Sequence, residues 1–275
     1  MSTNENKGKK TEVTALQAIS AEDRKDWISL AFVQAGICVC VPAFLLGALL
    51  AEAMPIWPAI ISGSLGYLIV VIGMVATGMI GCDLGLASCT CCQAGFGKSG
   101  ARFIVSTIFA VNMIGWFGIQ NGVCGEAFSN AMLAMTGWDI PVVVSNTIWG
   151  IIMLLTAVYG VHALEKLDKI SIPLLMIIMC CGTFLAFKVY GTGNLNDEGT
   201  VQSMSFMSGV ALSFNFTAVG TITGPDYTRF QKSRKDTVKS VFYGVFPMGV
   251  ITLIMGIVLT KLSGQYDIGM VLIEV

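Results

Sequence analysis

The chain has 275 residues, of which 55% are hydrophobic and 12% are charged, and its formal net charge is −1. Because about a quarter of the residues of a typical soluble domain are charged, this composition excludes an ordinary soluble protein and indicates an integral membrane protein. The balanced charge offers no electrostatic basis for binding nucleic acid. A single histidine, His162, excludes most histidine-based catalytic and metal sites and is expected to lie in a loop.

The N-terminal residues 1–26 are polar and of mixed charge, and we expect a solvated cytoplasmic tail without a cleavable signal peptide. Apolar segments of bilayer-spanning length follow, and they should be helices because lipid offers no partners for backbone polar groups. The seven expected spans cover roughly residues 27–51, 58–81, 101–128, 140–163, 170–190, 202–225 and 239–262. Another apolar run begins at residue 268, so we expect the chain to be part of a longer protein.

Lysine and arginine residues set the expected orientation, because they are enriched in cytoplasmic loops. With the N-terminus inside, only Lys188 and Lys261 fall outside, which leaves 14 of the 16 basic residues in inside segments. We therefore predict a multi-pass protein of the plasma membrane with a cytoplasmic N-terminus. The inside segment 82–100 is long enough to hold a short interfacial helix, and the glycine-rich outside loop 191–200 should be a flexible connector.

A cluster of cysteines lies in the inside segment 82–100, and it consists of Cys82, Cys89, Cys91 and Cys92. The C-x-x-C spacing of Cys89 and Cys92 would suit a metal or redox site, but such a site needs a second pair or a histidine. We predict reduced thiols in a cytosol-facing loop, without metal or cofactor, and keep a metal or redox role as the alternative.

Few reactive groups lie inside the spans. Glu126, near the outer end of span three, is either a carboxylate at a helix end or a proton-linked or gating group. The sequence contains no H-E-x-x-H or G-x-S-x-G motif and no serine–histidine pair, so no enzyme is expected.

Helix breakers interrupt spans one and six. Span one contains Gly36 and Pro42, and span six contains Gly220, Gly224 and Pro225. Paired interruptions in two halves of a membrane protein point to a transport site, where freed carbonyls hold a cation and helix ends hold a polar substrate. The alternative is the general tolerance of membrane helices for glycine and proline.

The stretch "IGWFGIQNG" in span three places Trp116 and Gln120 on one helical face, with Asn112 one turn earlier. An indole beside an amide suits a flat heterocycle, which stacks on the ring and hydrogen-bonds to the amide through its edge. Packing of the tryptophan and bonding of the glutamine to a neighbouring helix is the alternative.

Span six could supply the second wall of such a site. Phe214 and Phe216 compete for a stacking role, and the sequence does not choose between them. Asn215 between them has both donors and an acceptor for a polar contact.

Two segments carry a resemblance to a known family, "GWFGIQ" at 115–120 and "GTITGPDYTRF" at 220–230, with "DLGLAS" at 83–88 as a weaker match. The chain after residue 27 resembles the nucleobase–cation symporters, the family of cytosine, uracil, allantoin and hydantoin permeases, and is most similar to the bacterial cytosine branch. The resemblance implies an all-α, polytopic, LeuT-like fold of twelve helices. Ten of these form two inverted repeats, here about 27–190 and an incomplete 202–275, with the chain ending after about seven helices.

The resemblance also implies roles for single residues. Trp116 would stack on the base, Gln120 would bind it through the amide, and Phe216 would supply the second aromatic face. Asn215 would add a polar contact. Backbone carbonyls of Gly36 and Val39 would bind Na⁺.

Asp226 and Arg229 are spaced i, i+3 at the inner end of span six, and we expect a gating or structural ion pair. Three departures from the family pattern stand out, and the most serious is that spans eight to twelve are missing. One extra residue separates Phe216 from Asp226, and Met113 stands where the cytosine branch has a glutamine.

We therefore predict a secondary active transporter, a monomer in the bilayer, that imports a nucleobase with a coupling cation. Cytosine and Na⁺ are the first choices; uracil, allantoin, hydantoin, a purine and H⁺ stay open. A membrane-embedded enzyme and a fragment that does not transport are the alternatives from other classes.

Overall fold

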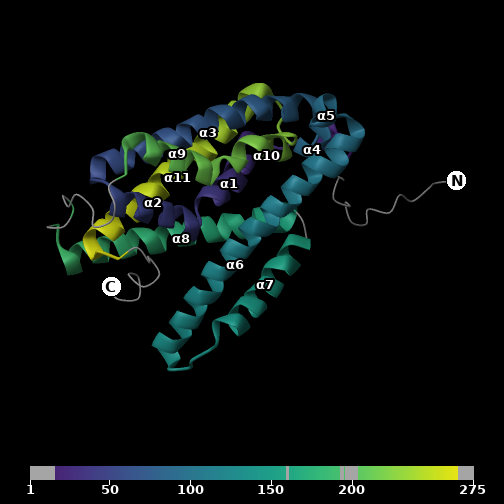
Figure 1. The fold of residues 1–275 in the computed structure, drawn as a ribbon. Helices are drawn as coiled ribbons and strands as arrows, with labels where there is room; N and C mark the ends of the chain where they lie inside the picture. Colours follow the sequence, from purple (N-terminus) through teal and green to yellow (C-terminus); the bar gives the residue numbers. More distant parts are fainter. Residues whose placement is uncertain (1–15, 159–160, 193–194, 196–203, 266–275) are drawn as a thin grey trace.

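The computed structural model describes residues 16–158, 161–192, 195 and 204–265, without the side chains of 161–166 and 168, and consists of packed helices (Figure 1). No strand occurs in these described ranges, where the single β-bridge joins Lys25 to Gln231. The all-α prediction is thus confirmed. The apolar run at 268 and the side chain of His162 lie outside the described residues.

The predicted spans are present. In the described part of the chain, five helices are long and apolar enough to cross a membrane, and a bent pair and a shorter apolar helix complete the set. The bounds are α1 (Trp27–Cys38) with α2 (Val41–Ala53), α3 (Ile56–Leu84), α6 (Ser106–Thr136), α7 (Val142–Val158), α8 (Val161–Tyr190), α9 (Phe206–Thr217) with α10 (Val219–Thr228), and α11 (Arg234–Ser263).

The break in span one is confirmed. Its two helices are bent by 52° at Val39 and Cys40, whose backbones are non-helical. Pro42 stands in the first turn of α2, where its missing N–H has no intrahelical acceptor to lose.

The break expected at Gly220, Gly224 and Pro225 in span six is wrong. Helix α10 runs through all three residues, and the interruption lies earlier, at Ala218, which itself keeps right-handed helical angles. Gly224 serves packing instead, because a Cβ there would lie 2.6 Å from Thr77 Oγ1 and 3.0 Å from the Met74 carbonyl oxygen.

A hydroxyl of α3 explains how Pro225 fits inside α10. Proline cannot donate to the carbonyl four residues earlier, which here belongs to Thr221. The Thr77 hydroxyl donates to that carbonyl at 2.6 Å, its shortest contact, and replaces the missing bond. A partner 144 residues away thus preserves the helix.

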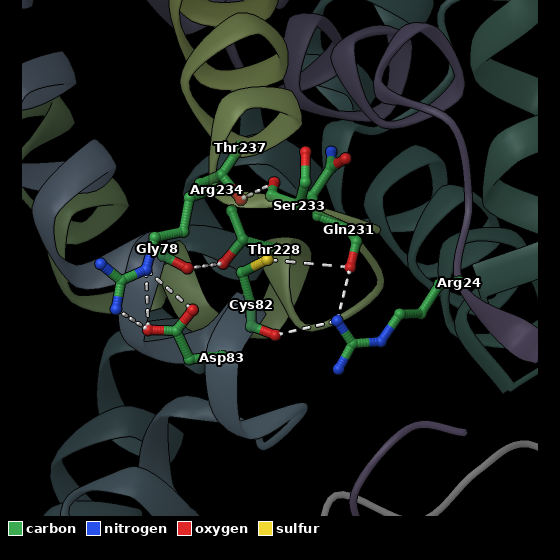
Figure 2. A network of polar contacts seen from close by, with 9 residues as sticks. All are labelled: Arg24, Gly78, Cys82, Asp83, Thr228, Gln231, Ser233, Arg234 and Thr237. Carbon is green, nitrogen blue, oxygen red and sulfur yellow. Dashed lines mark hydrogen bonds and ion pairs between the residues drawn. The ribbon is translucent and has the colours of Figure 1, made fainter. Parts of the chain in front are cut away.

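The tail is not wholly solvated, contrary to our expectation. Ile19 is 4% exposed, and its N–H donates to the Gly85 carbonyl at 2.9 Å. The Arg24 Nη1 donates to the carbonyls of Cys82 at 3.1 Å and Gln231 at 3.0 Å (Figure 2). The Cys82 carbonyl belongs to the last turn of α3, which lacks intrahelical donors and attracts cations, so residues 16–26 find a docking surface there.

Ion pairs join the same end of the molecule. Arg234 at the start of α11 binds Asp83 at the end of α3, with Nε–Oδ1 at 2.9 Å, and Lys232 binds Asp26 at 2.6 Å (Figure 2 shows the first pair). The tail and the segments after spans two and six therefore meet at one end, as the predicted topology requires. The membrane side that this end faces stays a prediction.

Segment 82–100 contains two short helices, α4 (Ser88–Cys91) and α5 (Gln93–Gly100), and α5 is kinked at Gly97; their place at the membrane interface stays a prediction. A π-helical turn, Ala101–Val105, leads from α5 into α6. Helices α6 and α7 then form an antiparallel pair that stands apart from the helices around α3 and α11 (Figure 1).

Candidate functional site

A cavity of about 260 Å³ lies where the break of span one faces α6 and α10. Gly36 and Cys40 line it from span one, Trp116 and Gln120 line it from α6, and Phe216 lines it from α9. The structure therefore brings four predicted site residues together, and it selects Phe216 over Phe214, which is not a lining residue.

The two aromatic residues contact each other directly. The ring centroids of Trp116 and Phe216 are 5.3 Å apart, and the ring planes are inclined at 88°. This edge-to-face arrangement is a favourable aromatic pair in its own right. The predicted sandwich is thus not open, because a base between two parallel rings needs about 7 Å, twice a carbon–carbon contact distance.

The polar wall of the cavity is built at the break. Gln120 is half-buried and its amide lies beside the thiol of Cys40. The Cys40 thiol donates to the Ile37 carbonyl at 3.4 Å. An amide that can both donate and accept hydrogen bonds therefore borders otherwise apolar walls, a composition typical of small-molecule sites.

Several lining residues do not follow from the sequence-based expectations. Thr223 and Tyr227 line the cavity from α10, and Met153 lines it from α7. Thr223 and Tyr227 follow Phe216 at seven and eleven residues, which is one helical face, so the helical period could have found them. Met153 offers no such signal.

Other predicted residues do not reach the cavity. Asn215 is exposed and is not a lining residue, and the same holds for Asn112. Asn215 lies about 100° from Phe216 around the helix, on the side opposite to Thr217, which does line the cavity. The predicted polar contact from Asn215 has no support in this arrangement.

The residues proposed for the cation lie at the break. Gly36 lines the cavity, whereas the Val39 side chain is 6% exposed and packs near Ile172. The neighbouring carbonyl of Cys38 accepts from Thr252 Oγ1 at 3.3 Å. Among the described residues, no hydrogen bond found ends on the carbonyls of Gly36 or Val39, so these oxygens fit a hard cation.

Asp226 and Arg229 lie towards the end where the tail docks. Asp226 Oδ1 accepts the Ser88 N–H at 3.1 Å and so ties α10 to α4. Arg229 is 8% exposed, and its guanidinium carbon lies 4.8 Å from the ring centroid of Phe230. Both contacts fit a structural role, and the ion pair between the two stays a prediction.

The remaining candidates are a carboxylate and the cysteines. Glu126 is exposed on α6. All four clustered cysteines are free, and burial raises the pKa of the Cys89 and Cys91 thiols, which disfavours the thiolate that metal and redox chemistry need. The described residues contain no group of three or more histidine, cysteine or acidic residues that could hold a metal ion.

Curated relatives are permeases. The chain is 27% identical to the cytosine permease of Escherichia coli (strain K12) over 255 residues, 91% of this chain and 58% of that protein. It is 25% identical to the purine-uracil permease NCS1 of Arabidopsis thaliana over 249 residues, 80% of this chain and 41% of that protein. The chain therefore spans little more than half of the bacterial relative.

Solved structures share the fold. Mhp1, a nucleobase-cation-symport-1 family transporter, in a closed conformation with bromovinylhydantoin bound, superposes with a TM-score of 0.84 at 18% identity, covering 95% of this chain and 60% of that chain. Its inward-facing conformation gives 0.77 at 16% identity, covering 95% and 59%. The predicted LeuT-like fold is confirmed for the part that the chain spans.

A family model described as "permease for cytosine/purines, uracil, thiamine, allantoin" matches residues 19–272, nearly the whole chain. The match includes the break of span one and every residue that lines the cavity. The chain thus belongs to the family of permeases for cytosine/purines, uracil, thiamine and allantoin.

Proposed function

We propose that the chain forms the substrate-binding part of a secondary active transporter that imports a nucleobase with a cation across the plasma membrane. The observation that carries this proposal is the meeting of Trp116, Gln120 and Phe216 on one cavity at the break of span one. Two aromatic rings and one amide are the groups that a flat, polar-edged heterocycle needs.

In the proposed loading step, the base replaces the contact between Trp116 and Phe216. One ring must turn from the edge-to-face arrangement, at 88°, so that the base can lie against the indole. The lost ring–ring contact is compensated by stacking of the base, and the Gln120 amide pairs with its edge. Binding would favour an occluded state, and alternating access would follow.

Cytosine is the first candidate substrate, because its amino group and carbonyl offer the donor and acceptor that an amide complements. The similarity to a cytosine permease supports this choice. Uracil, allantoin, hydantoin and purines share the same edge chemistry and stay as alternatives within the family.

Na⁺ is the proposed coupling ion. The carbonyls of Gly36 and Val39 lie on either side of residues that also border the cavity, so a cation there would order the break and the substrate wall together. H⁺ is the alternative, with Glu126 as the titrating group, but its exposed position on α6 is separate from the cavity.

A binding and uptake panel tests the substrate. In proteoliposomes, Gln120→Ala is expected to weaken binding of [¹⁴C]cytosine about tenfold or more, because a bound base leaves its buried polar edge unpaired. Gln93→Ala, an amide of α5 outside the cavity, is the matched control and should bind as the parent does. An unchanged affinity in folded Gln120→Ala protein would show that the amide is structural, and conversion of the recovered label would support a membrane enzyme.

Replacement of Na⁺ by choline tests the coupling. Cytosine affinity should fall several-fold without Na⁺. The carbonyls at the break of span one would then lose the cation, and the cavity wall at the break would become less ordered. The measurement is equilibrium binding of [¹⁴C]cytosine at constant ionic strength and pH. Equal affinities in the two media would refute Na⁺ coupling, and a dependence on pH alone would favour H⁺.

A further inference from the structure

Helices α6 and α7 carry the same short spacing, asparagine followed by glycine four residues later. Asn121 and Gly125 form it in α6, and Asn146 and Gly150 form it in α7. The helices are antiparallel neighbours (Figure 1), so the asparagine of each helix comes level with the glycine of the other.

Each asparagine is seated on the opposite glycine. A Cβ on Gly125 would lie 1.7 Å from Asn146 Oδ1, 2.7 Å from its Cγ and 2.9 Å from its backbone N. A Cβ on Gly150 would lie 3.2 Å from Asn121 Nδ2 and 3.4 Å from its Oδ1. The space where a side chain at Gly125 would lie, here called the Gly125 notch, is therefore filled completely by Asn146. The corresponding space at Gly150, the Gly150 notch, is lined closely by Asn121.

The amide oxygens are not held there by ordinary hydrogen bonds. Oδ1 of Asn121 and of Asn146 are buried, and neither has an N–H or O–H donor among the described residues. Asn146 Oδ1 instead lies in the direction of a Cα–H bond of Gly125, a contact that recurs between packed helices. Polar groups buried at such a cost are best known as devices that specify register.

The register between α6 and α7 determines which of their residues line the cavity. Gln120 precedes Asn121 directly, and Met153 follows Gly150 by three residues; both line the cavity. The notch face and the cavity face are thus adjacent faces of one hairpin. Rotation of α6 by one residue, about 100°, would carry Gln120 away from the break of span one.

We propose that Asn121, Gly125, Asn146 and Gly150 are positioning residues that set the rotation of α6 and so aim Trp116 and Gln120 into the cavity. The consequence for substrate binding rests on the function proposed above. The rotation itself does not, and it can be measured without any substrate.

The substrate-independent test is a cross-link between Cys40 and a cysteine at position 120, since Cys40 and Gln120 lie side by side. The parent carries Gln120→Cys and alanine at the other eight native cysteines, and a short bifunctional methanethiosulfonate is the reagent. Adding Gly125→Ala should lower the yield about fivefold or more, because the backbone of α7 must move away. Gly122→Ala, where a Cβ meets nothing within 4 Å, is the matched control and should cross-link as the parent does.

Combining Gly125→Ala with Asn146→Ala tests whether the Asn146 side chain causes the clash. Removing that side chain eliminates two of the three close contacts and should restore about half of the parent yield. Asn146→Ala alone creates no clash and is the variant to use if Gly125→Ala does not fold; it should lower the yield about threefold. A parent that fails to cross-link, a Gly125→Ala yield equal to the parent's, or a full yield with Asn146→Ala would each overturn the proposal.

Binding of [¹⁴C]cytosine to the chain with native cysteines separates the two proposals. Gly125→Ala should weaken it about tenfold, and the double variant should recover part of the loss. If the cross-link follows the expected order but the parent binds none of cytosine, uracil, allantoin or hypoxanthine, the proposed function fails and the positioning role stands. If the parent binds cytosine and Gly125→Ala binds it equally, the positioning role fails and the function stands.

Discussion

Alanine in place of Gly256 is expected to lower the stability of the chain strongly, because the added methyl group would meet the backbone of a neighbouring helix. A Cβ at this position would lie 2.2 Å from the carbonyl oxygen of Phe44 and 2.9 Å from its carbon, both backbone atoms of α2. Gly47 of α2 repeats the arrangement, because a Cβ there would lie 2.4 Å from the backbone oxygen of Leu253 in α11. Because a helix carbonyl cannot rotate away, α2 and α11 must separate along their contact.

The expected cost is about 3 kcal/mol, the upper end for overpacking, against a total stability of about 5–15 kcal/mol. Thermal unfolding in detergent, followed by circular dichroism and by the monodisperse fraction on size exclusion, should show a clear fall in Tm. Gly115→Ala in α6, where a Cβ meets nothing within 4 Å, is the control and should melt with the parent. Coincident melting curves for Gly256→Ala and the parent would contradict the close approach of the two helices.

Removal of the indole at position 116 should cause the largest loss of substrate binding. Trp116 is the larger of the two rings that meet at 5.3 Å, and under the proposed function it is the surface against which the base lies. Stacking of a base on an aromatic side chain is worth about 1–3 kcal/mol, so Trp116→Ala should weaken [¹⁴C]cytosine binding by about 5- to 150-fold. Trp116→Phe, which keeps a flat face, should retain most of the affinity.

Trp138 provides the matched control, since it is 69% exposed just after α6 and is not a lining residue of the cavity. Trp138→Ala should bind cytosine as the parent does, with the same folded fraction. Two results would speak against the stacking role: an unchanged affinity in folded Trp116→Ala protein, or an equal loss in the alanine and phenylalanine variants. The second result would indicate that the indole acts through packing or its N–H instead.

Much of the architecture and part of the site could be predicted from the amino-acid order. The spans, the helical content of segment 82–100 and the break of span one follow from apolar length, loop composition and Pro42, all of which act within a few residues. Helical spacing and the resemblance predict Trp116, Gln120 and Phe216 as site residues, and the fold brings them to one cavity.

The errors have a common cause. Gly220, Gly224 and Pro225 have the composition of a break, yet α10 continues through them because Thr77 supplies the missing donor. The tail has a soluble composition, yet Arg24 binds the Cys82 carbonyl in the last turn of α3 and the Gln231 carbonyl beyond α10. In both places a group distant in sequence satisfies a local defect.

The sequence by itself determined which segments cross the bilayer and where span one bends, because the transfer of a side chain into lipid and the geometry of proline are local properties. Only the tertiary structure decided which glycines unwind a helix and which admit a neighbour, and that Met153 of α7 lines the cavity. Those outcomes depend on the atoms that a second helix places opposite each position. No local pattern encodes them, since Gly36 beside a break and Gly224 beneath Thr77 are the same residue in a similar apolar run.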